Sequence, residues 1–311
     1  MKFLVYPVIL LTIYSTLLSA DSITDSNGVE IKFKSPFHRI ISLYPAHTEN
    51  LIQLGAGARI IAVSKNSSES AKKLKVPIIS TSDNAERYLK LNPDLILIRP
   101  MHYRAHKSLF KTLEKLGVTV AALQPVSIEE MYKYWLKLGK LSGKEADAEK
   151  MVKGFKDELK KYTEKSSAIP EMKRKKVYFE SIHSRMRTFS KKSMAIFVLK
   201  NAGGINIADD AVAVHSSNIA SYSKEKILAK ADQIDVFLSQ KGRMNNITVD
   251  KIKNEPGFQV IKAVKNNKIY LVSEKIVSRP TPNLLKGIKT IYEILYDEDV
   301  KKERRKGSIL H

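Results

Sequence analysis

Tyrosine, histidine and arginine side chains follow the apolar runs of this chain at positions where a ligand could meet them. Tyr44 and His47 come directly after residues 40–43, a run of strand length. A second group follows the continuous apolar run 95–98 and consists of Arg99, Met101, His102 and Arg104. In open α/β sheets, ligands bind at the carboxyl ends of strands. We therefore expect these side chains to line a binding site.

The later part of the chain adds four candidates. His183 and Arg187 follow the strand-like run 177–181, His215 lies in a loop, and Arg279 follows the apolar run that ends at Val272. Several arginines around one site suit an anionic ligand, because guanidinium groups form charge-assisted hydrogen bonds. Tyrosine and histidine could stack on, or ligate, an incompletely coordinated metal. We expect a metal chelate, with only His183 and His215 as candidates for direct metal ligands.

Nothing in the sequence indicates covalent catalysis. The chain has no cysteine, and it lacks the phosphate-loop, dinucleotide, nucleophile-elbow and zinc-protease motifs. The candidate loops are rich in bases and poor in carboxylates, which disfavours an acid/base pair. We predict a binding protein with no catalytic residue and no cofactor. The alternatives from other classes are a metal-dependent enzyme with a two-lobed cleft and a protein that binds bare metal ions through histidines.

Short apolar runs alternate with amphipathic segments, and these elements must position the candidate side chains. Residues 21–37 have the pattern of a β-hairpin, and the alternation from residue 39 to 123 predicts a mostly parallel sheet. Residues 144–165 carry apolar side chains at helical spacing and contain no proline. A second alternating series runs from residue 177 to 296. The prediction is an α/β fold with two Rossmann-like lobes joined by one long rigid helix.

The expected divisions of the chain are a signal peptide over 1–20, an N-terminal lobe over 21–126, a helical connector over 127–170, a C-terminal lobe over 171–300 and a basic tail over 301–311. Ser127 and Glu130 predict a capping box before a helix. Thr48 is expected to cap the helix after the first strand of the sheet and to place Glu49 in its first turn. Residues 99–104 are expected to form a loop.

Composition limits the classes of binding partner and the cellular compartment that we expect for this chain. The chain has 311 residues and a formal net charge of +22, which allows nucleic acid, an anionic membrane surface or an anionic small ligand. Its lysines are scattered over helix faces, so we expect solvated surface, no nucleic acid and a monomer. The apolar run in residues 1–20, with Ser19 and Ala20 at its end, predicts a cleavable signal peptide, with a retained membrane anchor as the alternative. Because no cysteine is present, a periplasmic protein without a lipid anchor is expected.

Several segments together resemble a known family. They are the 25–28 turn, Arg39-Ile-Ile-Ser-Leu-Tyr-Pro-Ala-His-Thr-Glu49, Leu54-Gly-Ala-Gly57, Ile61-Ala-Val-Ser64, Leu91-Asn-Pro-Asp-Leu-Ile-Leu-Ile98, Ala202-Gly-Gly-Ile-Asn206, Ser223-Lys-Glu-Lys-Ile-Leu228 and Ser278-Arg-Pro280. In order and spacing, the chain resembles periplasmic substrate-binding proteins of ABC importers, the class that serves ferric siderophores, haem and cobalamin. The match spans nearly the whole chain after residue 20 and does not specify the ligand.

The resemblance implies a mechanism. Two lobes on one stiff helix would hinge slightly around a ligand and dock on an inner-membrane ABC permease through one glutamate on the rim of each lobe. Glu49 and Glu225 match these two docking positions. The expected ligand is an anionic metal chelate, with a ferric siderophore ranked first. Haem, cobalamin and a nickel chelate are the alternatives, and the absence of tryptophan from the candidate loops disfavours cobalamin.

Overall fold

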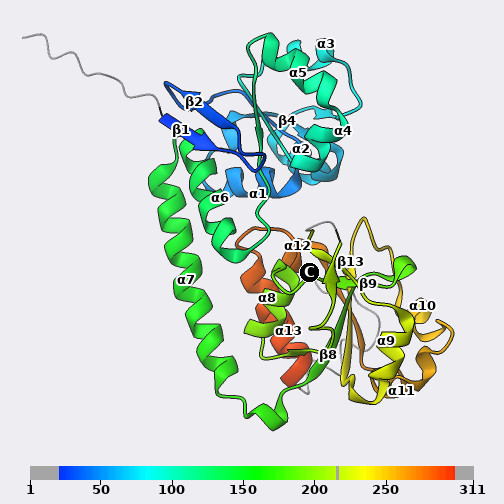
Figure 1. The fold of residues 1–311 in the computed structure, drawn as a ribbon. Coiled ribbons are helices and arrows are strands. Elements are labelled where there is room, and N and C mark those ends of the chain that lie inside the picture. Colours follow the sequence, from blue (N-terminus) through cyan, green and yellow to red (C-terminus); the bar gives the residue numbers. More distant parts are fainter. Residues whose placement is uncertain (1–20, 215–216, 298–311) are drawn as a thin grey trace, which may run out of the picture.

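A computed structural model describes residues 21–214 and 217–297 of the chain. The predicted signal peptide, His215 and the predicted basic tail lie outside the described residues. Two α/β lobes lie one above the other, with the N-terminal lobe at the top of Figure 1, and helix α7 (Glu145–Ser167) runs along both. The predicted architecture of two lobes and one long helix is confirmed.

The N-terminal lobe is built on a five-stranded sheet in the order β5-β4-β3-β6-β7, in which every pairing is parallel. Strands β3 and β6 are buried along their whole length, as expected for strands covered on both faces. Strands β1 and β2 form the predicted antiparallel hairpin beside this sheet. The bounds are β1 Asp21–Thr24, β2 Glu30–Phe33, β3 Ile40–Ser42, β4 Ile60–Ser64, β5 Ile78–Ile79, β6 Leu95–Ile98 and β7 Thr119–Ala122.

The C-terminal lobe contains a mixed sheet in the order β11-β12-β9-β8-β13-β14, with β10 paired to β8. Strands β8, β10, β13 and β14 pair in parallel, whereas β8, β9, β12 and β11 pair antiparallel. The strands β9 to β12 were not predicted, because runs of two or three residues show no periodicity. The bounds are β8 Lys176–Ile182, β9 Arg187–Phe189, β10 Ile205–Asn206, β11 Val212–Ala213, β12 Ile219–Ser221, β13 Val236–Lys241 and β14 Ile269–Ser273.

Thirteen α-helices accompany these sheets in the described residues. No described helix is both long enough and apolar enough to cross a membrane. Besides α7, the helices are α1 Pro45–Gln53, α2 Ser68–Leu74, α3 Ala85–Leu89, α4 Pro100–Ala105, α5 Lys107–Lys115, α6 Ile128–Leu141, α8 Met194–Asn201, α9 Lys224–Ala229, α10 Val249–Lys253, α11 Lys262–Lys265, α12 Glu274–Val277 and α13 Leu284–Tyr296.

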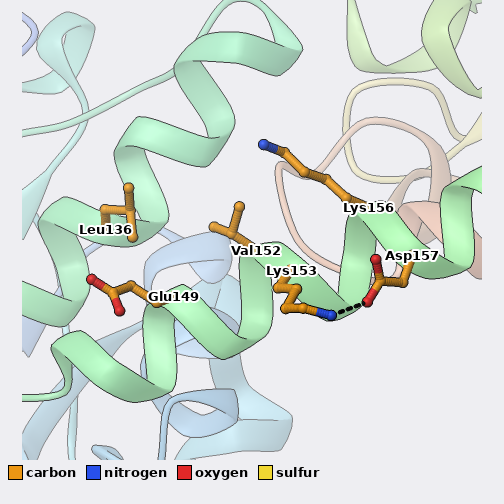
Figure 2. Close-up of a pocket in the computed structure, with 6 residues that line it drawn as sticks. All are labelled: Leu136, Glu149, Val152, Lys153, Lys156 and Asp157. Atoms are coloured by element: carbon orange, nitrogen blue, oxygen red, sulfur yellow. Dashed lines mark hydrogen bonds and ion pairs between the residues drawn. The ribbon is translucent and has the colours of Figure 1, made fainter.

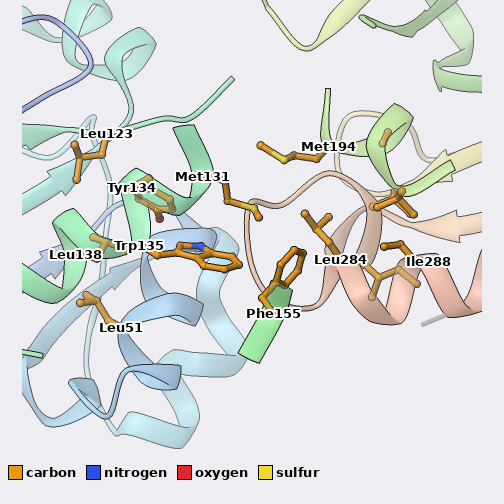
Figure 3. Packing of buried hydrophobic residues seen from close by; sticks show 14 of the residues in the cluster. Leu51, Leu123, Met131, Tyr134, Trp135, Leu138, Phe155, Met194, Leu284 and Ile288 are labelled. Atoms are coloured by element: carbon orange, nitrogen blue, oxygen red, sulfur yellow. The ribbon is translucent and has the colours of Figure 1, made fainter. Parts of the chain in front are cut away.

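One hydrophobic cluster continues from the N-terminal lobe into the C-terminal lobe. Trp135 of α6 is fully buried and meets Phe155 of α7 edge-to-face, with ring centroids 5.2 Å apart. Leu284 and Ile288 of α13 belong to the same cluster, and Figure 3 shows them facing Phe155 from the other lobe. The lobes are therefore joined by shared apolar packing as well as by α7, and this packing opposes large lobe movements.

Two helices begin at a proline, where the sequence analysis placed no helix start. Helix α1 begins at Pro45 with Tyr44 as its N-cap, so Thr48 is not the cap and Glu49 is not in the first turn. Helix α4 likewise begins at Pro100, so the predicted loop over 99–104 is wrong. Both differences have one cause, since proline lacks an N–H and its fixed φ suits the first helical position. The cap of α6 is confirmed, because the Ser127 hydroxyl accepts the Glu130 N–H at 3.3 Å.

Candidate ligand-binding site

Tyr44 and Arg99 lie side by side at the carboxyl ends of β3 and β6, which are neighbouring parallel strands. The Arg99 guanidinium lies 4.8 Å from the centroid of the Tyr44 ring. Its Nη2 contacts the Met101 sulfur at 3.0 Å and His102 Nε2 at 3.4 Å, whereas its Nε is buried without a partner. No carboxylate of the described residues lies within 4.0 Å of Arg99. In the described part of the chain, Arg99 is therefore a cation without a directly paired carboxylate.

Arg279 has the opposite surroundings, because two carboxylates pair with it. Its Nη1 donates to Glu49 of the N-terminal lobe, 230 residues away in sequence, and its Nη2 lies 2.9 Å from Glu274. Burial raises the pKa of Glu49 above its ordinary value, and the attraction of Arg279 only partly offsets this. Burial works to lower the pKa of Arg279, but the two carboxylates outweigh it and raise that pKa. The result is a desolvated ion triad that bridges the lobes.

The charges of both groups of residues act on the Tyr44 phenol. Burial raises the pKa of the Tyr44 phenol, Arg99 and Arg279 act to lower it, and Glu49 and Glu274 act to raise it. We call these five residues the Tyr44 cluster. Its two arginines and two glutamates balance in formal charge.

Two polar contacts cross between the lobes beside the Tyr44 cluster. Arg243 Nη1 donates to the side-chain oxygen of Asn66 at 2.6 Å. Lys275 pairs with Glu69 at 3.0 Å, and both of these side chains are exposed. Together with the Glu49–Arg279 pair, these contacts join α1 and the segment after β4 to the segments after β13 and β14.

A buried contact lies beneath these pairs. The carbonyl oxygen of Pro280 accepts hydrogen bonds from Trp135 Nε1 at 2.9 Å and from Asn50 Nδ2 at 3.0 Å. Pro280 follows Arg279 directly, so this contact fixes the backbone that carries the arginine.

His47 lies below the site rather than in it. Its side chain is fully buried, with Nδ1 2.7 Å from the Tyr134 hydroxyl and Nε2 3.3 Å from the Ile98 carbonyl oxygen. Burial lowers the pKa of His47 to about 3, so the ring is neutral. In this structure His47 has no free nitrogen for a ligand, and its contacts are those of a residue that holds α1 against the carboxyl end of β6.

The other candidates after β6 are nearer the surface. Met101 is half-exposed and Arg104 is exposed on α4. His102 is partly buried, and its Nδ1 has no hydrogen-bond partner. Burial, assisted by Arg99, lowers the pKa of His102 to about 4, so this ring is neutral at pH 7. His102 thus offers an uncharged hydrogen-bonding group next to Arg99.

His183 is engaged within its own lobe. Its Nδ1 lies 2.7 Å from buried Glu180, and its Nε2 lies 3.4 Å from Glu255. The hydrogen bond with Glu180 raises the pKa of His183 more than burial lowers it. Across residues 21–214 and 217–297, no three histidine or acidic side chains are placed to hold a metal ion. Arg187 is partly buried at the start of β9 instead of in a loop.

The two predicted docking glutamates have different surroundings. Glu225 is exposed in the first turn of α9, after the N-cap Ser223. Glu49 instead faces Arg279, with its side chain 22% exposed. Glu86 was not among the predicted residues, yet it is 70% exposed in the first turn of α3, after the N-cap Asn84.

Glu86 and Glu225 occupy equivalent places in the two lobes. Helix α3 precedes β6, which pairs with the first strand of its sheet, β3; helix α9 precedes β13, which pairs likewise with β8. A shared pattern, a capping residue two positions before the glutamate, could have revealed this equivalence in the sequence.

Two hollows on the surface of the described residues are lined by none of the predicted residues. The first, of about 310 Å³, lies on the α6–α7 side and is lined by Leu136, Glu149, Val152, Lys153, Lys156 and Asp157 (Figure 2). The second, of similar volume, lies between Val126 and the C-terminal lobe near Lys191 and Ala213. Neither hollow marks the candidate site. That site consists of side chains from the two lobes that are in contact with each other.

Comparisons with known proteins agree with this architecture. A family model described as periplasmic binding protein matches residues 40–275. A structure described as a possible iron-binding (periplasmic solute-binding) protein from Staphylococcus epidermidis is 30% identical, covers 85% of this chain and 100% of its own, and has a TM-score of 0.71.

Two curated relatives are similar over most of their length. An uncharacterised ABC transporter substrate-binding lipoprotein of Bacillus subtilis is 26% identical, over 90% of this chain and 87% of its own. A vitamin B12-binding protein of Vibrio vulnificus is 27% identical, over 83% of this chain and 90% of its own. These are binding proteins, which confirms the prediction that the chain is not an enzyme.

Proposed function

Because this chain belongs to the periplasmic binding protein family, we propose that it is the solute-binding component of an ABC importer and captures an anionic metal chelate. A ferric siderophore is the first expectation for the chelate. The observation that carries the proposal is Arg99 beside Tyr44, a cation at the carboxyl end of a central strand that has no acidic partner among residues 21–214 and 217–297. Such a group binds an anionic oxygen ligand through charge-assisted hydrogen bonds. The protein itself needs no cofactor and works as a monomer.

A corrinoid is the second candidate ligand, because several relatives are named as vitamin B12-binding proteins. The site residues favour it less. Trp135, the only tryptophan, is fully buried in the cluster between the lobes and cannot stack on a ligand. Haem and a nickel chelate remain alternatives of the same class.

For docking on the permease we propose Glu225 in the C-terminal lobe and Glu86, in place of Glu49, in the N-terminal lobe. A docking carboxylate must be exposed to reach an arginine of another protein, and both residues are exposed. Their equivalent positions on α3 and α9 suit a partner with two similar halves. Glu49 is occupied by Arg279 and would have to break a desolvated ion pair first.

The proposed location is the periplasm, after cleavage of residues 1–20, without a lipid anchor because the sequence has no cysteine. The Bacillus subtilis relative is named as a lipoprotein, so this chain would differ from it. Mass measurement of the exported protein tests the proposal: a mass that still includes residues 1–20, or an added lipid, would contradict it.

A ligand panel tests the proposed function. Purified protein is titrated with a ferric trihydroxamate, a ferric tris-catecholate, haem, cobalamin and nickel with histidine, and binding is followed by protein fluorescence and calorimetry. We expect one chelate to bind with a Kd below about 1 μM, corresponding to about −8 kcal/mol. Bare zinc and nickel are the controls. If only the bare ions bind, or no member of the panel binds, the proposal fails.

A further inference from the structure

The way in which the charges of the Tyr44 cluster are paired indicates which ligand charge the site can accept. The number of arginines alone does not. Of its two arginines, Arg279 is paired with Glu49 and Glu274. On the rim, Lys275 is paired with Glu69. Three carboxylates supplied by the protein thus compensate two of the cations that lie where the lobes meet.

Arg99 is the cation of the cluster that forms no salt bridge within the described residues, although the cluster as a whole is neutral. Its contacts are the neutral groups Met101, His102 and the Tyr44 ring. Within the described residues, Arg99 Nε and His102 Nδ1 are both buried without a hydrogen-bond partner, and such groups are costly unless something satisfies them. The guanidinium N–H of Arg99 is a donor of the kind that an anionic oxygen of a ligand would satisfy.

We propose that Glu49 and Glu274 act as built-in counter-ions of Arg279, so that the site selects chelates with a single anionic group, received by Arg99, over multiply anionic chelates. This inference rests on the proposed function and adds the charge class of the ligand to it. The physical reason is electrostatic: a multiply anionic chelate brought between the lobes meets Glu49 and Glu274 in a region shielded from water, where repulsion is strong.

Glu49 has a further property that suits this role. Its Oε2 is buried and has no hydrogen-bond partner in the described residues. Its other oxygen accepts the hydrogen bond from Arg279. An anionic oxygen has no proton to donate to this acceptor, so a second anionic group placed beside Glu49 would leave it unsatisfied and would be repelled by the carboxylate.

A charge series of chelates tests the inference on the whole protein. The probes are a ferric linear trihydroxamate with its terminal amine free (cationic), acetylated (neutral) or succinylated (singly anionic), and a triply anionic ferric tris-catecholate. For the wild type we expect the succinylated form to bind about 10-fold more tightly than the free-amine form, from one charged hydrogen bond. The tris-catecholate should bind more weakly than the succinylated form.

Variants assign this preference to named residues. Glu49→Gln should strengthen tris-catecholate binding about 10-fold relative to the succinylated probe, and Arg99→Gln should remove the advantage of the succinylated probe. Glu158→Gln, an exposed change of the same charge on α7, is the matched control. Glu274→Gln repeats the test if Glu49→Gln folds poorly, as judged by circular dichroism, since Arg279 keeps one carboxylate in either variant.

The outcomes separate the two proposals. If hydroxamate and catecholate bind without a charge preference, or if Glu49→Gln behaves as Glu158→Gln does, the charge inference is overturned while the importer function stands. If no probe of this series and none of the larger panel binds, the proposed function falls and the inference falls with it.

Discussion

Individual side chains of this protein have roles that depend on which neighbours neutralise them. Arg99 and Arg279 have the same chemistry, but two carboxylates pair with Arg279 and none pairs with Arg99 in the described residues. Likewise His47 and His102 both have lowered pKa values, yet only His102 retains an unpartnered nitrogen. Burial and pairing therefore decide which residues a ligand can use.

His47 gives a prediction on acid stability. Its pKa is about 3 in the folded protein and 6.5 in an ordinary environment, so between these values the unfolded chain binds the proton that the folded one excludes. The wild type should lose stability as pH falls from about 6.5 towards 3. His47→Gln should lose less over the same range, although it costs about 1 kcal/mol at neutral pH through changed hydrogen bonds.

Urea unfolding at several pH values measures this difference. Exposed His38 supplies the control, because His38→Gln should follow the wild-type curve. Parallel pH curves for the wild type and His47→Gln would show that His47 is not the buried neutral group described.

At the scale of elements, helix contacts place the residues of the Tyr44 cluster. Helix α12 carries Glu274 and is followed by Arg279, and α13 packs closely against it. A Cβ added at Gly287 of α13 would lie 2.1 Å from the Ile276 carbonyl oxygen of α12, which is too close for any side chain. The glycine therefore allows the approach that positions the C-terminal part of the cluster.

Gly287→Ala should destabilise the protein by about 3 kcal/mol, because backbone and not a flexible side chain must move. The matched change Gly154→Ala in α7 meets nothing within 4 Å and should stabilise by about 0.5–1 kcal/mol through helix propensity. Thermal unfolding of the two variants gives the comparison. Equal effects of the same sign would contradict this account of α12 and α13.

At the scale of the whole molecule, the two lobes contact each other through their inner faces, and each lobe carries an exposed glutamate at an equivalent position. Glu86 and Glu225 lie on α3 and α9, whereas Glu49 lies between the lobes. In the proposed function, docking and ligand capture therefore use different carboxylates, and mutation can separate the two roles.

The double variant Glu86→Ala, Glu225→Ala should keep the ligand affinity of the wild type and lower uptake in cells by roughly 10-fold or more, because charged pairs with a partner are lost. Glu30→Ala, an exposed change in the hairpin, is the control. Glu49→Ala should instead change affinity. Normal uptake by the double variant, with lost uptake in Glu49→Ala at unchanged affinity, would restore Glu49 as the docking residue.

Patterns within short stretches of sequence were enough for the fold. The alternation of apolar runs and helical segments predicted two α/β lobes, and the unbroken apolar spacing of residues 144–165 predicted α7. These features depend on neighbours within a few residues, so they are readable locally. The short strands β9 to β12 and the helix α4 were not predicted, and α1 was predicted to begin after a cap at Thr48 instead of at Pro45. The signals of the short strands are weak, and the effect of proline at a helix start was not recognised.

Contacts between distant segments decided the site. The sequence placed Tyr44 and Arg99 at strand ends, and the parallel pairing of β3 and β6 made them neighbours. The pairing of Glu49 with Arg279 joins residues 230 positions apart and depends on how the lobes face each other. Residue type alone therefore determined what chemistry the chain could offer, whereas only the tertiary structure determined which charges cancel, because electrostatic pairing acts over ångströms in space and not along the chain.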